Sequence, residues 1–214
     1  MQFTLLVSVL QILFFFCLSC SNSDLRNPNT LEQAKIEAIE ISQIKKEFMY
    51  GMMWLYVDED NNTFNGWVKE SHPNQNLKSL GYLKNGQKQG LWISWYENGE
   101  RESDIEWDKD QYHGIFRCWF SNGKPKVVGQ TQDGEVNGEW KNYYTNGQLN
   151  AHSINEIGKL KSIKVWRDDG GICQESKVEE GDGIFIEYDE YGKQIQKRIF
   201  KEGVEIKESS PKRR

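Results

Sequence analysis

The chain has 214 residues, the length of one domain with accessory segments, and is rich in Trp, Tyr, Phe and Gly (8, 9, 10 and 19 residues). Aromatic residues favour strands and Gly favours tight turns, so this composition predicts an all-β body. The net charge of −5 and the isoelectric point near 5.4 argue against a nucleic-acid partner, which would need a basic face.

Residues 1–20 have the pattern of an export signal, because the segment is strongly apolar and carries no charged side chain. It ends in Leu18-Ser19-Cys20-Ser21, which resembles the lipobox of bacterial lipoproteins. Two departures are Cys17, at a position that is usually aliphatic, and the lack of Lys or Arg before the apolar run. We predict a lipoprotein signal peptide over 1–20, lipidation of Cys20, and an exported, lipid-anchored protein of the cell envelope. A cleaved signal without lipid and an uncleaved anchor are the alternatives.

A polar linker over 21–30 precedes a segment with helical periodicity. Thr30 with Gln33 fits a capping box. Apolar residues then recur at steps of three and four, at Ala34, Ala38, Ile41, Ile44 and Phe48. This pattern predicts one helix over 31–48, with its apolar stripe packed against an end of the sheet.

From residue 52 to residue 206 the sequence changes to strand-like segments that repeat, and a polar tail over 207–214 follows. Each clear copy begins with Gly and ends in Asn-Gly, and the copies lie 24 residues apart at 90–99, 114–123 and 138–147. Degraded copies occur at 66–75, 161–170 and 183–192. These copies predict about six β-hairpins in an antiparallel meander.

Two sets of turns separate the predicted strands. Asn-Gly at 98–99, 122–123 and 146–147 predicts type I′ turns, in which both central residues have positive φ. A second set separates the units, at Asn85-Gly86, Asp133-Gly134 and Glu202-Gly203.

Aromatic residues occupy two fixed positions in the repeat. The first position holds Trp92, Phe116, Trp140 and Phe185, and the second holds Trp95, Trp119, Tyr143, Trp166 and Tyr188. Equivalent positions of neighbouring hairpins align, so we expect these rings to pack on one another as a core. The alternative is a ladder of exposed rings that binds sugar or choline groups.

The unit Gly-x-Trp-x-x-Tyr-Tyr-x-Asn-Gly resembles the MORN-repeat family, specifically its variant repeats, and the beginning of the repeat region resembles the bacterial YwqK-type subgroup. The resemblance covers about residues 52–206. It implies an elongated, single-layered antiparallel sheet that mediates protein or membrane contacts. For the YwqK-type subgroup it also implies antitoxin components.

The repeat register separates the two cysteines outside the signal segment. Cys118 falls on the first strand of the third repeat and Cys173 on the second strand of the fifth. Five strand steps of about 4.8 Å place them more than about 20 Å apart, whereas a disulfide needs Cα atoms within about 7 Å. Both are predicted to be reduced.

No motif points to catalysis. His72, His113 and His152 occupy different repeat positions and lack metal-ligand spacing. The glycines belong to turns of fixed period rather than to a phosphate-binding loop. Alternating carboxylates such as those of Asp104 and Glu106 are typical of a solvated strand face. We predict no catalytic residue, no metal site and no cofactor.

These observations favour a non-enzymatic protein-binding or scaffolding module, whose protein partner is unknown and which the N-terminal segment anchors to the membrane. Self-association through an open sheet edge is a further possibility. The alternatives are a glycan- or choline-binding wall module and an intracellular antitoxin-like protein of the YwqK type.

Overall fold

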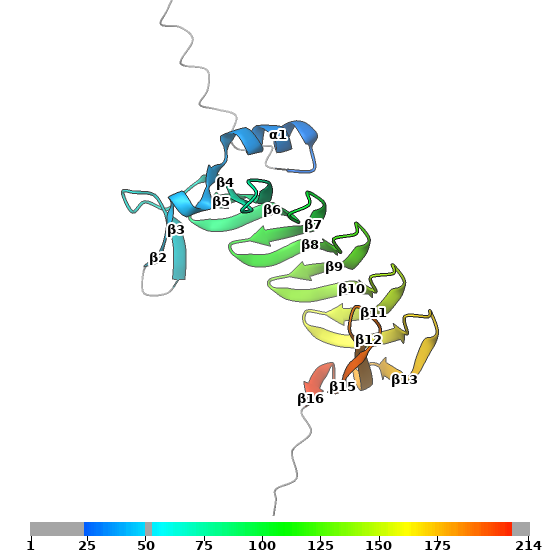
Figure 1. Cartoon of the computed structure of the whole chain (residues 1–214). Coiled ribbons are helices and arrows are strands. Elements are labelled where there is room, and N and C mark those ends of the chain that lie inside the picture. The colour runs from blue at the N-terminus through cyan, green and yellow to red at the C-terminus, as the bar shows by residue number, and fades with distance from the viewer. Residues whose placement is uncertain (1–23, 50–52, 207–214) are drawn as a thin grey trace, which may run out of the picture.

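The computed structural model describes residues 24–49 and 53–206 (Figure 1). The predicted signal peptide, its lipidation site Cys20 and the polar tail over 207–214 lie outside the described residues. The described part contains one α-helix, α1 (Pro28–Glu37), and one short 3-10 helix, η1 (Ile41–Gln43). Its strands are β1 (Ile39–Glu40), β2 (Lys45–Met49), β3 (Met53–Val57), β4 (Gly66–Ser71), β5 (Leu77–Lys84), β6 (Gln87–Trp95), β7 (Arg101–Asp108), β8 (Gln111–Trp119), β9 (Pro125–Gln132), β10 (Glu135–Tyr143), β11 (Leu149–Glu156), β12 (Lys159–Trp166), β13 (Ile172–Glu179), β14 (Asp182–Tyr188), β15 (Gln194–Lys201) and β16 (Val204–Ile206).

A single long sheet forms the body of the protein (Figure 1). Its fourteen strands follow the order β1-β4-β5 and then run consecutively to β16, and every pair from β4 onward is antiparallel. The strands from β4 to β15 make the six predicted hairpins, so the all-β meander is confirmed. β1 is the exception to the antiparallel pattern, because Ile39 pairs in parallel with Val68. β2 and β3 form a separate hairpin.

The two long sides of the sheet use different turns. On one side both central residues have positive φ, for example Asn85 (51°) and Gly86 (74°), which is the type I′ pattern. On the other side only Gly of the Asn-Gly pair has positive φ, as at Gly99 (86°), whose N–H donates to the Tyr96 carbonyl at 2.9 Å. The prediction of type I′ turns at 98–99, 122–123 and 146–147 is therefore wrong. These hairpins have longer loops that end in a left-handed Gly.

The asparagines of these longer loops link each hairpin to the next. Each side-chain oxygen accepts the N–H two residues further on, which fixes the loop and keeps the asparagine out of the left-handed region. Each side-chain amide then donates to a carbonyl in the following loop. The donor pairs are Asn74 to Glu97 (3.1 Å), Asn98 to Ser121 (3.3 Å), Asn122 to Thr145 (3.1 Å) and Asn146 to Asp168 (3.0 Å). This ladder explains physically why Asn recurs in the first four units.

Removing one asparagine of the ladder should weaken the stack measurably. Asn122→Ala loses both the bond from the Lys124 N–H (3.0 Å) and the bond to Thr145. We expect it to lower the free energy of unfolding by about 1–2 kcal/mol in urea titrations. Asn122→Asp keeps the accepting oxygen and loses only the donor, so it should cost less. An Asp variant as damaging as the Ala variant would contradict this assignment.

The N-terminal helix is shorter than predicted and begins earlier. Its N-cap is Asn27 and not the predicted Thr30. The Asn27 side-chain oxygen accepts hydrogen bonds from the N–H groups of Asn29 (2.9 Å) and Thr30 (3.3 Å). It ends at Glu37, and 39–49 contains β1, η1 and β2, so the predicted N-terminal helix is confirmed but its predicted bounds, 31–48, are wrong.

The cause of this difference is that the apolar residues of 31–48 pack on opposite faces of the sheet. Ala34 and Ala38 join Leu80, Leu91 and Ile93 on what we call the helix face. The isoleucines of the following segment instead pack near Val68, Leu83 and Trp92 on the opposite face. A continuous helix cannot reach both faces, so the chain becomes extended and crosses the edge of β4.

The face that carries Trp92 is called the aromatic face. Its register places Trp92, Phe116 and Trp140 in one cross-strand row, with Ile105 and Gly129 on the strands between them. The first of the two aromatic repeat positions thus lies on this face. Trp95, from the second position, packs instead with the helix-face cluster.

At its C-terminal end the sheet curls back over the aromatic face (Figure 1). The Thr145 N–H and hydroxyl both donate to the Glu190 carbonyl, at 3.1 and 3.2 Å, although the two residues are 45 positions apart. A buried cluster forms inside the curl from Ala151, Leu160, Ile163, Val165, Cys173, Val178, Ile186 and Phe200. Both ends of the sheet therefore carry additional packing, which the expectation of a single layer did not include.

Candidate binding surface

The titratable residues of the described part do not converge on a metal centre. No group of three or more His, Cys, Asp or Glu residues in 24–49 and 53–206 is placed to hold an ion. His72 contacts the Trp95 carbonyl (2.8 Å), His113 faces Asp133 (3.3 Å), and His152 lies 3.8 Å from Glu139. The structure thus places the three histidines at separate points of the sheet.

Cys118 on β8 and Cys173 on β13 are both free thiols, as the repeat register predicted. Burial raises the pKa of the Cys118 thiol to about 11. A thiol with so high a pKa stays protonated at neutral pH, which makes it a poor nucleophile.

Aromatic rings form a continuous row across the aromatic face. Trp107 contacts Tyr112 with ring centroids 4.3 Å apart, Tyr112 contacts Phe116 edge-on at 5.4 Å, and Phe116 contacts Trp140 at 5.1 Å. We call these four residues the aromatic row. Offset and edge-on contacts of this kind stabilise ring pairs beyond the area they bury.

The rings of the aromatic face differ in burial along the sheet, from Trp92 at the N-terminal end to the aromatic row beside it. At its N-terminal end the Lys88 ammonium lies 4.4 Å from the ring of Trp92 and 4.3 Å from that of Trp107, and burial lowers the pKa of Lys88. Trp92 is buried in the cluster beneath η1 and β3. Tyr112 is 36% exposed, and Phe116 and Trp140 are half-buried. The repeat aromatics are therefore core at one end and half-buried in the centre, where Tyr112 is the exposed ring.

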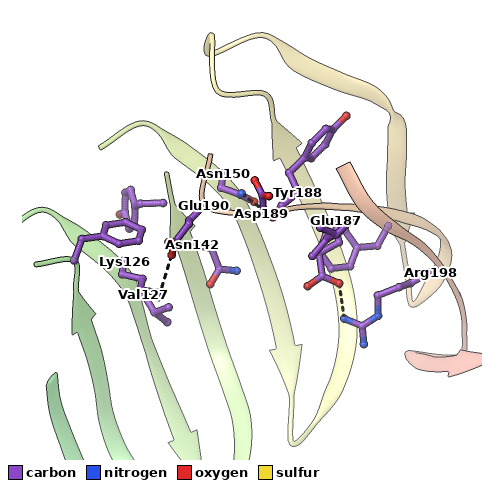
Figure 2. Close-up of a pocket in the computed structure, with 13 residues that line it drawn as sticks. Lys126, Val127, Asn142, Asn150, Glu187, Tyr188, Asp189, Glu190 and Arg198 are labelled. Atoms are coloured by element: carbon purple, nitrogen blue, oxygen red, sulfur yellow. Dashed lines mark hydrogen bonds and ion pairs between the residues drawn. The ribbon is translucent and has the colours of Figure 1, made fainter. Parts of the chain in front are cut away.

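A cavity of about 360 Å³ lies on the same face, where the curled C-terminal hairpin approaches β9 and β10 (Figure 2). Val127 and Asn142 lie at its base, and Lys126 and Arg198 stand on opposite sides (Figure 2). Lys126 pairs with Glu190 at 3.2 Å. Arg198 pairs with Glu187 at 3.6 Å and with Glu205 at 2.7 Å.

Sequence reasoning missed this cavity. Its residues come from β9, β10, β11, β14 and β15 and from loops beside them, and the fold brings them together only because the sheet curls. Lys126 and Glu190 are 64 positions apart, so no local pattern or repeat position identifies their pairing.

No α-helix of the described residues is long and apolar enough to span a membrane. The apolar segment 1–20 lies outside these residues, so the predicted export signal and the lipidation of Cys20 stay predictions.

Comparison with known proteins identifies the repeats. The family model described as the MORN repeat variant matches residues 88–109 and 136–153. The first match covers β6 with β7, and the second covers most of β10 with the first half of β11. No curated protein matches the chain. The six-hairpin meander therefore contains repeats of the MORN variant type, matched in the hairpins β6–β7 and β10–β11.

Proposed function

We propose that this protein is a non-catalytic module of the cell envelope that holds a protein partner on its aromatic row. MORN repeats commonly serve as protein- or membrane-binding modules, which is compatible with such a role. The observation that carries the proposal is the row itself, in which the rings of Trp107, Tyr112, Phe116 and Trp140 contact one another in sequence on one face of the sheet.

The chemistry of the row suits a protein interface. Trp and Tyr are the residues most enriched where protein interfaces concentrate their binding energy. They present large contact areas, and here ring contacts already restrict their rotation, so little conformational entropy remains to be lost on binding. The Lys88 ammonium, 4.3 Å from the Trp107 ring, adds a polar group at the edge of the aromatic row.

The envelope location rests on the sequence. The apolar segment 1–20 and the lipobox-like Leu18-Ser19-Cys20 support export and lipidation. Several acyl chains on one cysteine would hold the sheet stably at a membrane surface. The membrane-bound wild-type protein should then have a mature N-terminus at Cys20 with added acyl mass, measured by intact mass spectrometry, and Cys20→Ala should lose that mass. A wild-type product that is unprocessed and soluble would contradict the export signal and favour the antitoxin-like alternative.

Site-specific photocrosslinking in cells tests the binding surface directly. We would place a photoreactive phenylalanine analogue at Tyr112, in the aromatic row, and at Tyr191, which is 72% exposed in the β14–β15 loop. The proposal expects a discrete protein adduct from position 112 and none from position 191. Equal adducts at both positions, or no discrete adduct at 112, would contradict it.

A further inference from the structure

The cavity beneath the C-terminal hairpin has the features of a small-molecule site. Its volume of about 360 Å³ falls within the range of ligand pockets, roughly 300–1,000 Å³. Hydrogen bonds hold the C-terminal hairpin over the cavity. Thr145 donates to the Glu190 carbonyl, and Asn150 donates to the Tyr188 carbonyl at 3.4 Å. The cavity is thus built by tertiary contacts across the sheet and exists in the folded chain without a partner.

Both cations of the cavity lining are paired with carboxylates, and the third carboxylate, that of Asp189, binds backbone N–H groups. Glu190 is paired with Lys126, and Glu187 accepts from Gln196 at 2.6 Å and pairs with Arg198. Asp189 accepts the N–H groups of Tyr191 (3.0 Å) and Lys193 (2.9 Å), which fixes the hairpin loop. A charged ligand must compete with one of these pairs, and a buried or half-buried pair that loses a partner is destabilised.

Uncharged hydrogen-bonding groups remain available at the base of the cavity. The Asn142 side-chain amide lies there (Figure 2) and has no hydrogen-bond partner among the described residues. An amide supplies two donors and an accepting oxygen. Lys126 has further N–H groups beyond the one directed at Glu190, and Glu187 and Glu190 retain lone pairs. These groups are able to bind hydroxyls while every ion pair stays intact.

The apolar part of the lining completes the recognition set. Phe120 and Phe185 belong to the cavity wall, and a cation lies over each ring, Lys126 at 5.2 Å and Arg198 at 5.6 Å. Val127 and Ile195 add aliphatic surface. Because Phe120 is buried and a cation covers one face of each ring, the aliphatic side chains supply the apolar surface for the C–H face of a ligand, and the polar groups can bind its hydroxyls.

We propose that this cavity binds a neutral saccharide unit, with Asn142 as the principal hydrogen-bonding residue. The site is distinct from the aromatic row and does not depend on the proposed protein partner. A small cation such as choline would have to displace Lys126 or Arg198 from its carboxylate, and an anion is disfavoured because the three carboxylates of Glu187, Asp189 and Glu190 outnumber these two cations.

Isothermal titration calorimetry of the folded chain tests this site. The probes are glucose, N-acetylglucosamine and the β-1,4-linked disaccharide of each, with choline chloride and inorganic phosphate as charged probes. We expect at least one sugar to saturate below about 10 mM, and Asn142→Ala to weaken its binding roughly tenfold through the lost hydrogen bonds. Gln130→Ala is the matched control, because Gln130 also presents an exposed amide but lies on the helix face, next to Gly129 on β9.

The outcomes separate clearly. Tighter binding of a disaccharide than of its monosaccharide indicates that the natural ligand is a polymer. Equal affinity for the two indicates a free sugar, and both results support the proposal. Absence of sugar binding, binding of choline or phosphate instead, or an unchanged affinity in Asn142→Ala overturns it. If Asn142→Ala fails to fold in thermal melts, Asn142→Gln, which keeps the amide but moves it, must show the loss of affinity. None of these results bears on the photocrosslinking at Tyr112, so either proposal can fail alone.

Discussion

Gly81→Ala is expected to lower the free energy of unfolding by about 3 kcal/mol, the upper end of the usual cost of overpacking a core. The indole ring of Trp92 lies directly on Gly81, and a Cβ added there would overlap the ring atoms. Trp92 is only 7% exposed and donates its indole N–H to the Tyr82 carbonyl at 3.2 Å. The ring cannot move without losing both its packing and this bond. Urea denaturation monitored by Trp fluorescence measures the effect.

Gly90→Ala separates this clash from backbone strain. Gly90 has a φ of 71°, and a Cβ added there would meet no other atom within 4 Å, so its substitution should cost only about 1 kcal/mol for the left-handed conformation. Gly81 has no positive φ, so its whole penalty comes from Trp92. Equal losses in the two variants would contradict the role assigned to Gly81. Gly129 lies beneath Trp140 in the same way, which shows that the glycine-on-tryptophan contact recurs along the aromatic face.

Tyr144→Ala is expected to cost about 4 kcal/mol, because it removes a large buried ring from the loop between β10 and β11. Tyr144 is 1% exposed and donates its hydroxyl to the Trp166 carbonyl at 2.7 Å, a bond that ties one hairpin to the next. The same burial raises the pKa of Tyr144 above its ordinary value, so the hydroxyl remains a donor throughout the physiological range.

Tyr144→Phe isolates the hydroxyl from the ring. It should cost about 1 kcal/mol, the usual net contribution of one hydrogen bond. Tyr96 makes the same bond to the Trp119 carbonyl at 2.7 Å, whereas Phe120 stands between them in the repeat series and is also buried. The natural phenylalanine indicates that the ring is the larger contribution. Chemical denaturation of both variants checks this order, and a Phe variant as unstable as the Ala variant would contradict it.

The hairpin meander was predictable because its cause is local. Gly at 86, 99, 123, 134 and 147 takes positive φ, which other L-residues adopt only with strain, so the turns occur where the sequence places these glycines. The turn types were less predictable. Asn98 and Gly99 as a pair suit a type I′ turn, but the Asn98 side chain instead binds the Glu100 N–H at 3.0 Å and the Ser121 carbonyl. Ser121 lies in the next hairpin, so the Asn-Gly pair alone gives no information about this contact.

The helix illustrates the same limit. Spacing of three and four residues from Ala34 to Phe48 is compatible with one amphipathic helix, yet Ala38 packs on the helix face and Ile41 on the aromatic face. Contacts with residues far along the chain determine where the helix ends, and local propensity is too weak to resist them.

The candidate surface also has some features that local sequence specifies and others that depend on tertiary contacts. The repeat, the six hairpins and the alignment of Trp92, Phe116 and Trp140 are predictable from the sequence, because turn chemistry and a fixed period specify register. Which of these rings are buried, and where a cavity forms, depends on contacts between distant strands. The additional layers over the aromatic face come from η1 and β3 at one end and from β14 and β15 at the other, through contacts such as Lys126 with Glu190. Such contacts depend on the curl of the whole sheet, a property that accumulates over many strands and is encoded in no single repeat.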